Sequence, residues 1–306
     1  MFNKLPKKVR IVEVGPRDGL QNEKTIVSLE DKVKYIELLS AAGLKDIEAM
    51  SFVRADKIPQ MSDGKSLYKS LVQNSLLKNT HLISLVPNKK GMEDAISVGV
   101  KDIAVFTATS NTFNQKNINA TIDESLVRIA EVCKMAKDNN IRVRGYISTV
   151  FGCPYEGQTS VDQFIKVAKT LRDFGVYEIS VGDTIGVANP LQIKNFLEIV
   201  LKEFKAEFLA MHLHDTRGLA TSNIIASLDF GISSFDSSSG GLGGCPYAVG
   251  ASGNVATEDI VNLFHSMGIE TGVDIEQLAV ASQFILQSIG RKSESRFLNA
   301  FLGSQK

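Results

Sequence analysis

The sequence is short of cysteine and tryptophan and has no excess of charge of either sign. Its 306 residues include three cysteines, no tryptophan, and 34 basic against 34 acidic side chains. Balanced charge excludes the strong positive field that is typical of proteins binding nucleic acid or anionic membranes. The odd, sparse cysteine count argues against a disulfide framework. No apolar run approaches the roughly 18–20 residues that a membrane-spanning helix needs.

Recognisable secretory and organelle-targeting patterns are also missing. The basic start, residues 1–8, is shorter than a mitochondrial transit peptide and lacks its arginine and serine content. We therefore expect a cytoplasmic protein, with neither nucleic acid nor a membrane as its partner. With 43% hydrophobic residues, the chain can form one large domain or two small ones.

One local pattern occurs four times along the chain. Each copy follows a segment with helical spacing and reads glycine, an aliphatic residue, two mostly polar residues, and a strand-like run. The four glycines are Gly43, Gly99, Gly175 and Gly231. Because glycine readily adopts the left-handed turn that ends a helix, the copies predict four equivalent helix-to-strand junctions.

Eight strand-like runs alternate with segments of helical spacing. The strand-like runs are 9–14, 47–52, 82–86, 103–107, 143–148, 179–181, 208–214 and 235–238; helical examples are 31–41, 124–137, 161–171 and 191–204. Short apolar strands alternating with helices predict parallel β-α-β units. Eight such units in about 250 residues match the size of a (β/α)8 TIM barrel.

The alternative architecture is an open, doubly wound sheet. Such a sheet is expected to carry a glycine-rich fingerprint after its first strand. Residues 15–19 read Gly-Pro-Arg-Asp-Gly and lack that fingerprint, which favours the barrel. Residues 275–289 read as one further helix, and no linker-like stretch separates them from the barrel. We predict a single domain over 1–306, with the barrel at about 9–270 and the C-terminal helix at about 275–289.

Two histidines provide the strongest candidate for chemistry. In a TIM barrel the active site lies at the C-terminal ends of the strands, where His212 and His214 lie in the seventh run. Residues i and i+2 of a strand face the same way, so both imidazoles share one face. Imidazole is a common ligand of divalent metals, although a hydrogen-bonded pair on the barrel wall remains an alternative.

Carboxylate and guanidinium groups are expected at the same end of the barrel. Asp18 and Arg17 lie in the loop after the first strand, and Glu48 lies on the second strand. The first and seventh strands are next but one to each other around a closed eight-stranded barrel. Asp18 with two histidines would leave coordination positions open for water and substrate, as a catalytic metal site needs. A helix cap or turn residue is the alternative interpretation of Asp18.

A glycine-rich loop with one cysteine follows the eighth strand. Residues 240–247 read Gly-Gly-Leu-Gly-Gly-Cys-Pro-Tyr, which puts Cys245 at the tip. A loop of this kind can approach a ligand closely, so Cys245 could act as a general acid or base on a closing lid. A phosphate cradle and an unreactive exposed thiol are the alternatives, but the Gly-Lys-Ser/Thr ending of a P-loop is missing.

The other candidates allow a structural interpretation. Asn254 could complete a metal shell or cap the next helix. Cys133 lies on a helix with apolar periodicity and is expected in the core. Cys153 follows the fifth strand; it could line the pocket, but a structural role is favoured. His81 and His265 are isolated and are expected to be structural.

Taken together, these motifs resemble those of the 3-hydroxy-3-methylglutaryl-CoA lyase family. The matching segments are 12–23 (Val-Glu-Val-Gly-Pro-Arg-Asp-Gly-Leu-Gln-Asn-Glu), 47–48, 51–52, 152–157, 182–186 (Gly-Asp-Thr-Ile-Gly), 212–215, the cysteine loop and 250–254. The resemblance extends from about residue 10 to residue 292. The cysteine loop is highly specific, whereas the Arg-Asp-Gly and His-x-His motifs are shared with a wider metallolyase superfamily that includes isopropylmalate and homocitrate synthases.

The resemblance implies a TIM-barrel lyase that splits 3-hydroxy-3-methylglutaryl-CoA into acetyl-CoA and acetoacetate, and that forms a homodimer. It implies a Mg or Mn ion held by Asp18, His212, His214 and Asn254. It implies a catalytic set of Arg17, Asp18, Glu48, His212 and Cys245. It also implies that the CoA arm binds near the open end of the barrel, with Lys116, Asn117 and Lys292 as candidate contacts.

One departure from the family concerns regulation. Some members carry a regulatory cysteine near the C-terminus, whereas this sequence has no cysteine after Cys245, so such regulation is not implied. The nearest alternative function is an aldolase or an acetyl-CoA-dependent condensing synthase on the same metal barrel. The cysteine loop and Glu48 favour the lyase. A non-catalytic metal- or CoA-binding barrel would lack at least one catalytic group. Other 3-hydroxyacyl-CoA substrates stay open, and both leucine degradation and ketone-body formation suit the chemistry.

Overall fold

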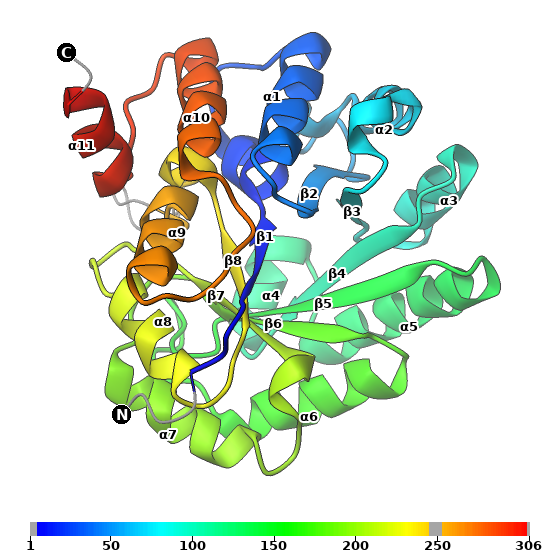
Figure 1. The fold of residues 1–306 in the computed structure, drawn as a ribbon. Helices are drawn as coiled ribbons and strands as arrows, with labels where there is room; N and C mark the ends of the chain where they lie inside the picture. The colour runs from blue at the N-terminus through cyan, green and yellow to red at the C-terminus, as the bar shows by residue number, and fades with distance from the viewer. Residues whose placement is uncertain (1–4, 245–252, 305–306) are drawn as a thin grey trace.

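The centre of the molecule is a barrel of eight parallel strands that follow one another around the axis (Figure 1). The computed structural model describes residues 5–244 and 253–304. The strands are β1 (Arg10–Glu13), β2 (Asp46–Ser51), β3 (His81–Leu85), β4 (Asp102–Ala108), β5 (Arg142–Ser148), β6 (Glu178–Asp183), β7 (Leu209–Leu213) and β8 (Ser234–Ser237). Strand β1 pairs with both β2 and β8, which closes the sheet. The predicted TIM barrel is confirmed, with a strand at each of the eight runs.

Helices form a ring outside the barrel (Figure 1). They are α1 (Leu29–Ala41), α2 (Gly64–Gln73), α3 (Lys89–Val98), α4 (Asn111–Ile118), α5 (Ile122–Asp138), α6 (Val161–Asp173), α7 (Pro190–Val200), α8 (Ala220–Leu228), α9 (Thr257–Ser266), α10 (Ile275–Ile289) and α11 (Arg296–Ser304). Short helical turns are η1 (Gly15–Gly19), η2 (Leu20–Asn22), η3 (Pro59–Met61), η4 (Ser75–Leu77), η5 (Ala206–Phe208) and η6 (Ser239–Gly241). The C-terminal helix predicted at 275–289 is confirmed as α10, which packs beside α1.

The predicted glycine junctions are present at all four positions. Gly43, Gly99, Gly175 and Gly231 have φ values of 96°, 83°, 90° and 80°. Each lies between a helix and one of the even-numbered strands. A side chain with a Cβ would be strained in this left-handed conformation, so the sequence pattern has a direct backbone cause.

One helix is shorter than its apolar spacing predicts. The pattern over 191–204 suggested a helix to residue 204, but α7 ends at Val200 and residues 201–204 form turns. Phe204 is nevertheless buried, because its ring stacks on that of Phe208 with centroids 5.5 Å apart. The segment after the helix also packs into the core, so the apolar spacing of the sequence continues beyond the end of α7.

The interior of the barrel contains both apolar and charged side chains. Apolar side chains from β1, β3 and β4, including Val12, Ile83 and Ala104, form one buried cluster. Charged side chains are buried there as well: Arg144 of β5 pairs with Asp236 of β8, and Glu48 of β2 pairs with Arg17. The main hydrophobic core instead lies where the strands meet the surrounding helices.

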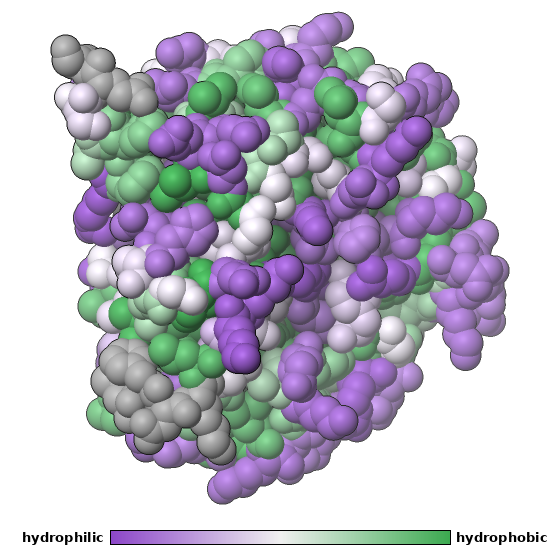
Figure 2. Space-filling model, viewed as in Figure 1, coloured by the Kyte–Doolittle hydropathy of each residue, from purple (hydrophilic) through white to green (hydrophobic). Residues whose placement is uncertain are grey.

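On the outer surface, polar residues cover much of the face drawn in Figure 2, and apolar residues appear there in scattered groups. Among the described residues, no helix combines the length and apolar character that crossing a bilayer requires.

Candidate active site

Four side chains predicted as metal ligands meet at the C-terminal end of the barrel. Asp18 comes from η1, His212 from β7, and His214 directly follows β7. One ligand atom from each of these three lies within 4.8 Å of the others. The Nε2 atoms of His212 and His214 are 3.4 Å apart, and His212 Nε2 is 4.0 Å from Asp18 Oδ2. Asn254 joins the group, because its Nδ2 donates to Asp18 Oδ2 at 2.8 Å.

The structure also decides between the interpretations of Asn254. Helix α9 has Ala256 at its N-cap and no side-chain cap, so Asn254 does not cap it. An isolated β-bridge pairs the backbone of Asn254 with that of His214 instead, and the Asn254 side chain contacts Asp18. Gly243 makes room for this arrangement: a Cβ at that position would lie 2.9 Å from Asn254 Nδ2.

The protonation states of this group suit a divalent cation. Burial raises the pKa of Asp18, but the positive charges of Arg17 and His212 outweigh burial and bring that pKa to about 2. Burial and the neighbouring His212 lower the pKa of His214 to about 4. Near neutral pH the site therefore presents a carboxylate and a neutral imidazole, which are the forms that bind metal.

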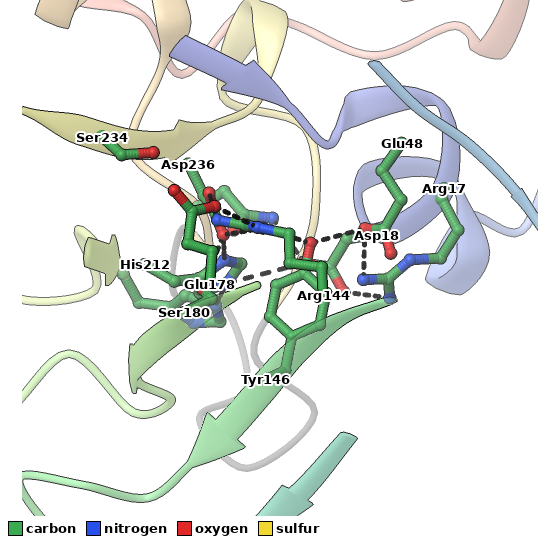
Figure 3. A network of polar contacts seen from close by, with 12 residues as sticks. Arg17, Asp18, Glu48, Arg144, Tyr146, Glu178, Ser180, His212, Ser234 and Asp236 are labelled. Carbon is green, nitrogen blue, oxygen red and sulfur yellow. Dashed lines mark hydrogen bonds and ion pairs between the residues drawn. The ribbon is translucent and has the colours of Figure 1, made fainter. Parts of the chain in front are cut away.

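A buried ion pair lies beside this group. Arg17 Nη2 donates to Glu48 Oε2 at 2.6 Å, and Arg17 Nη1 donates to Asp18 Oδ1 at 2.7 Å (Figure 3). The hydroxyl of Tyr146 donates to Glu48 Oε2 at 3.2 Å. Among the described residues, neither Arg17 Nε nor Glu48 Oε1 has a hydrogen-bond partner. The guanidinium is therefore held in place while part of its donor capacity stays unused.

Arg17, Asp18, Tyr146, His212 and His214 line a cavity of about 430 Å³, whereas Glu48 and Asn254 lie behind these residues and are not part of the lining. His212, His214, Arg17 and Asp18 form its polar end, and Gly244 reaches the same cavity. The walls and mouth also include Leu85, Phe106, Phe113, Ile118, Ile129, Ile147, Arg54, Lys57 and Arg128. The cavity thus combines a charged end with apolar walls and basic residues, a composition that suits an amphiphilic, anionic ligand.

Only one of the three predicted CoA contacts lines this cavity. Asn117 lines the cavity, whereas Lys116 and Lys292 are not among the described residues that line it. Lys116 lies over the ring of Tyr155, with its Nζ 4.4 Å from the centroid. Cys245 lies outside the described residues, so its place relative to the cavity stays a prediction.

The remaining cysteines and histidines have structural partners. Cys133 is buried, and burial raises the pKa of its thiol to about 12. Cys153 is also buried, and its Sγ donates to Ser110 Oγ at 3.0 Å. His81 lies near Asp46 at 3.2 Å, and His265 pairs with Thr271 at 2.8 Å. None of these four lines the described part of the cavity.

The sequence analysis missed several residues at the site, among them Tyr146, which contacts Glu48, and Asp236, which contacts His212. Asp236 of β8 accepts a hydrogen bond from His212 Nδ1 at 3.1 Å. This bond and the charge of Asp236 outweigh the effect of burial, which alone would lower the pKa of His212, so that pKa lies above its ordinary value. An aspartate within the predicted strand at 235–238 was the available signal, because a strand buried on both faces rarely carries an unpaired charge.

Proteins of similar sequence belong to one family. A family model described as HMGL-like matches residues 8–285. The mitochondrial hydroxymethylglutaryl-CoA lyase of Bos taurus is 48% identical over 295 residues, which cover 96% of this chain and 90% of that protein.

Solved structures agree as well. The crystal structure of hydroxymethylglutaryl-CoA lyase from Pseudomonas aeruginosa has a TM-score of 0.95 and 48% identity, covering 98% of this chain and 99% of that one. An HMG-CoA lyase from Acinetobacter baumannii in complex with coenzyme A and 3-methylmalate has a TM-score of 0.90 and 34% identity, covering 96% and 95%. The chain therefore belongs to the HMGL-like family, to which the family resemblance of its motifs had pointed.

Proposed function

We propose that this protein cleaves 3-hydroxy-3-methylglutaryl-CoA into acetyl-CoA and acetoacetate with the help of a divalent cation. The observation that carries the proposal is the meeting of Asp18, His212 and His214 with Arg17 in one cavity. Glu48 holds Arg17 there through an ion pair. A member of the same family has been solved with coenzyme A bound, which supports a CoA thioester as the substrate.

The donor set fits a metal ion. Asp18, His212, His214 and Asn254 would hold it, and the two facing Nε2 atoms need a proton or a cation between them. Two imidazoles and oxygen donors suit Mg or Mn as well as other divalent ions, and we propose Mg or Mn. When bound there, a divalent ion would lower the pKa of the substrate hydroxyl and so ease the loss of its proton.

Arg17 is the residue proposed to stabilise the leaving fragment. In a retro-Claisen cleavage the C3 hydroxyl loses its proton, the C2–C3 bond breaks, and its electron pair enters the enolate of acetyl-CoA. A fixed guanidinium is well suited to the thioester oxygen that carries this charge. Glu48 and Asp18 hold Arg17 from two sides, so little reorganisation is needed when the charge develops.

We propose roles in proton transfer and metal binding for the remaining catalytic candidates. The C3 hydroxyl must give its proton to a base, and a water molecule or His214 is the proposed acceptor. C2 must gain a proton, and Cys245 is the proposed donor. Both nitrogens of His212 have assigned contacts, Nδ1 with Asp236 and Nε2 at the metal position. We therefore propose that His212 acts as a ligand close to the reacting oxygen rather than by carrying a proton away.

The CoA arm is proposed to leave the cavity through its basic mouth. Arg54, Lys57 and Arg128 line the cavity together with Asn117, and phosphate groups favour such side chains. Lys116 and Lys292 stay candidate contacts further out. Homodimer formation and a cytoplasmic location stay predictions; the bovine relative is a mitochondrial protein by name.

A coupled assay on chelator-stripped protein tests the function. Acetyl-CoA release from 3-hydroxy-3-methylglutaryl-CoA should depend on added Mg or Mn and should be matched by an equal amount of acetoacetate. Stripped protein without added metal is the control. Absence of release with either metal would contradict the proposal, and turnover in the condensation direction from a 2-oxoacid and acetyl-CoA would favour a synthase.

A further inference from the structure

A buried carboxylate fixes which nitrogen of His212 faces the metal position. His212 and Asp236 are direct partners in the register of β7 and β8. Asp236 Oδ2 lies 3.1 Å from His212 Nδ1, and the Asp236 side chain has no exposed surface. Because a carboxylate only accepts, Nδ1 must carry the proton. In neutral His212 the lone pair is then on Nε2, which faces His214 Nε2 and Asp18 Oδ2.

Asp236 is itself held by a fully buried arginine. Arg144 Nη2 donates to Asp236 Oδ1 at 2.7 Å, and Arg144 Nη1 donates to Oδ2 at 3.1 Å (Figure 3). Ser180 Oγ adds a third hydrogen bond to Oδ2 at 2.7 Å. With both oxygens occupied, the carboxylate cannot rotate without breaking a charged hydrogen bond.

The network continues away from the site. Arg144 Nε donates to Glu178 Oε2 at 2.6 Å. Glu178 in turn accepts from Arg10 Nη1 at 2.8 Å, at the opposite end of the barrel. Figure 3 shows the line of side chains that results, from Glu178 through Arg144 to Asp236 and His212.

Stability alone does not explain this network. A buried ion pair is expensive to desolvate, and well-packed apolar residues in its place are often equally or more stable. The same barrel demonstrates that alternative, because an apolar cluster that includes Val12, Ile83 and Ala104 fills another part of its interior. The charged network is the part that adjoins His212, which indicates a role connected with the site.

We propose that Asp236 and Arg144 are positioning residues for the metal site. Asp236 holds His212 as the tautomer whose Nε2 is directed at the metal, and Arg144 acts through Asp236 by holding its carboxylate. This inference rests on the metal site proposed above. Mutating a group that orients a ligating histidine commonly weakens metal affinity by roughly 10–100-fold.

Manganese titration of chelator-stripped protein, followed by electron paramagnetic resonance, tests the proposal. Asp236→Asn should weaken Mn²⁺ affinity by roughly 10–100-fold, and Arg144→Met should weaken it in the same direction. The double variant should lose no more than the weaker-binding single variant, because both changes act through one carboxylate.

A matched control separates positioning from stability. Asp102 is another buried aspartate, on β4, where it contacts Arg142 at 3.5 Å and Tyr177 at 3.3 Å. Asp102→Asn changes a buried carboxyl group in the same way and should leave Mn²⁺ affinity unchanged, whatever change in thermal stability accompanies it. Unchanged affinity in Asp236→Asn would overturn the inference and leave the metal site standing. Losses that multiply in the double variant would overturn the role of Arg144.

A second measurement needs no variant. The chain has only four histidines, so ¹⁵N NMR of metal-free protein at alkaline pH can assign the tautomer of each ring. A proton on Nδ1 of His212 supports the inference, and a proton on its Nε2 overturns it. If the unmodified protein binds no Mn²⁺ at all, the proposed metal site is wrong and the inference falls with it.

Discussion

Arg17 and Glu48 form a buried ion pair across the first two strands of the barrel, with Nη2 and Oε2 2.6 Å apart. Glu48 has no exposed surface and Arg17 has little, so the pair excludes water from one side of the cavity. Water exclusion strengthens the guanidinium field at the position proposed for the thioester oxygen.

Arg17→Met should therefore lower kcat by roughly 10²–10³-fold, the usual cost of removing one oxyanion donor. KM should change far less, because the interaction is made mainly in the transition state. Steady-state kinetics would check this, with Arg142→Met at the other end of the barrel as the control. A rise in KM at constant kcat would reassign Arg17 to CoA binding.

Asp18→Asn should weaken Mn²⁺ binding, because it removes the only carboxylate among the proposed ligands. We expect a loss of roughly tenfold or more in a calorimetric titration. Asp173→Asn changes an exposed aspartate and serves as the matched control. Equal affinity in the two variants would remove Asp18 from the ligand set.

Cys245→Ala tests the cysteine loop. If Cys245 donates the proton to C2, turnover should slow by roughly 10²–10⁴-fold. Cys133→Ala is the control, because that thiol lies in the core away from the cavity. A near-normal rate in Cys245→Ala would exclude Cys245 from the mechanism.

Glu13 makes stability depend on pH. Burial raises the pKa of Glu13 from 4.5 to about 7, and its hydrogen bonds from Thr257, Ser239 and Gly15 only partly oppose this. Between these two values the folded state keeps a proton that the unfolded state has lost. The Glu13 contribution to stability is therefore fully present below about pH 4.5 and is lost as the pH rises through about 7.

Glu13→Gln should remove this dependence. Relative to the unmodified protein, the free energy of unfolding of the variant should gain up to about 3 kcal/mol between about pH 5 and about pH 8, at about 1.4 kcal/mol per pKa unit. Urea unfolding at the two pH values measures the difference. Glutamine can still accept from Gly15 and Ser239, so the local structure should persist. A difference that does not vary with pH would contradict the prediction.

Local pattern was sufficient to predict the fold. The glycine junctions and the apolar strand runs each depend on a few adjacent residues, and the His212–His214 pair follows from strand periodicity. The predicted C-terminal end of α7 was wrong, because Phe204 is buried although it lies beyond the helix.

The contact between Asp236 and Arg144 could be found only from the arrangement of the strands around the barrel. Their contact joins β5 to β8 across 92 positions of sequence, and no local spacing indicates it. The family resemblance named residues that meet in the cavity, but the groups that hold those residues became visible only when the barrel was closed.

The mixed interior of the barrel limits how the protein can be altered. In the charged network, the side chains that stabilise the fold also align His212, so an unfolding variant there would resemble an inactive one. In the apolar cluster, Val12, Ile83 and Ala104 have no polar contact with the site. A redesign for heat resistance therefore has Val12, Ile83 and Ala104 open to repacking, whereas the charged network and the cavity-lining Leu85 and Tyr146 must be kept.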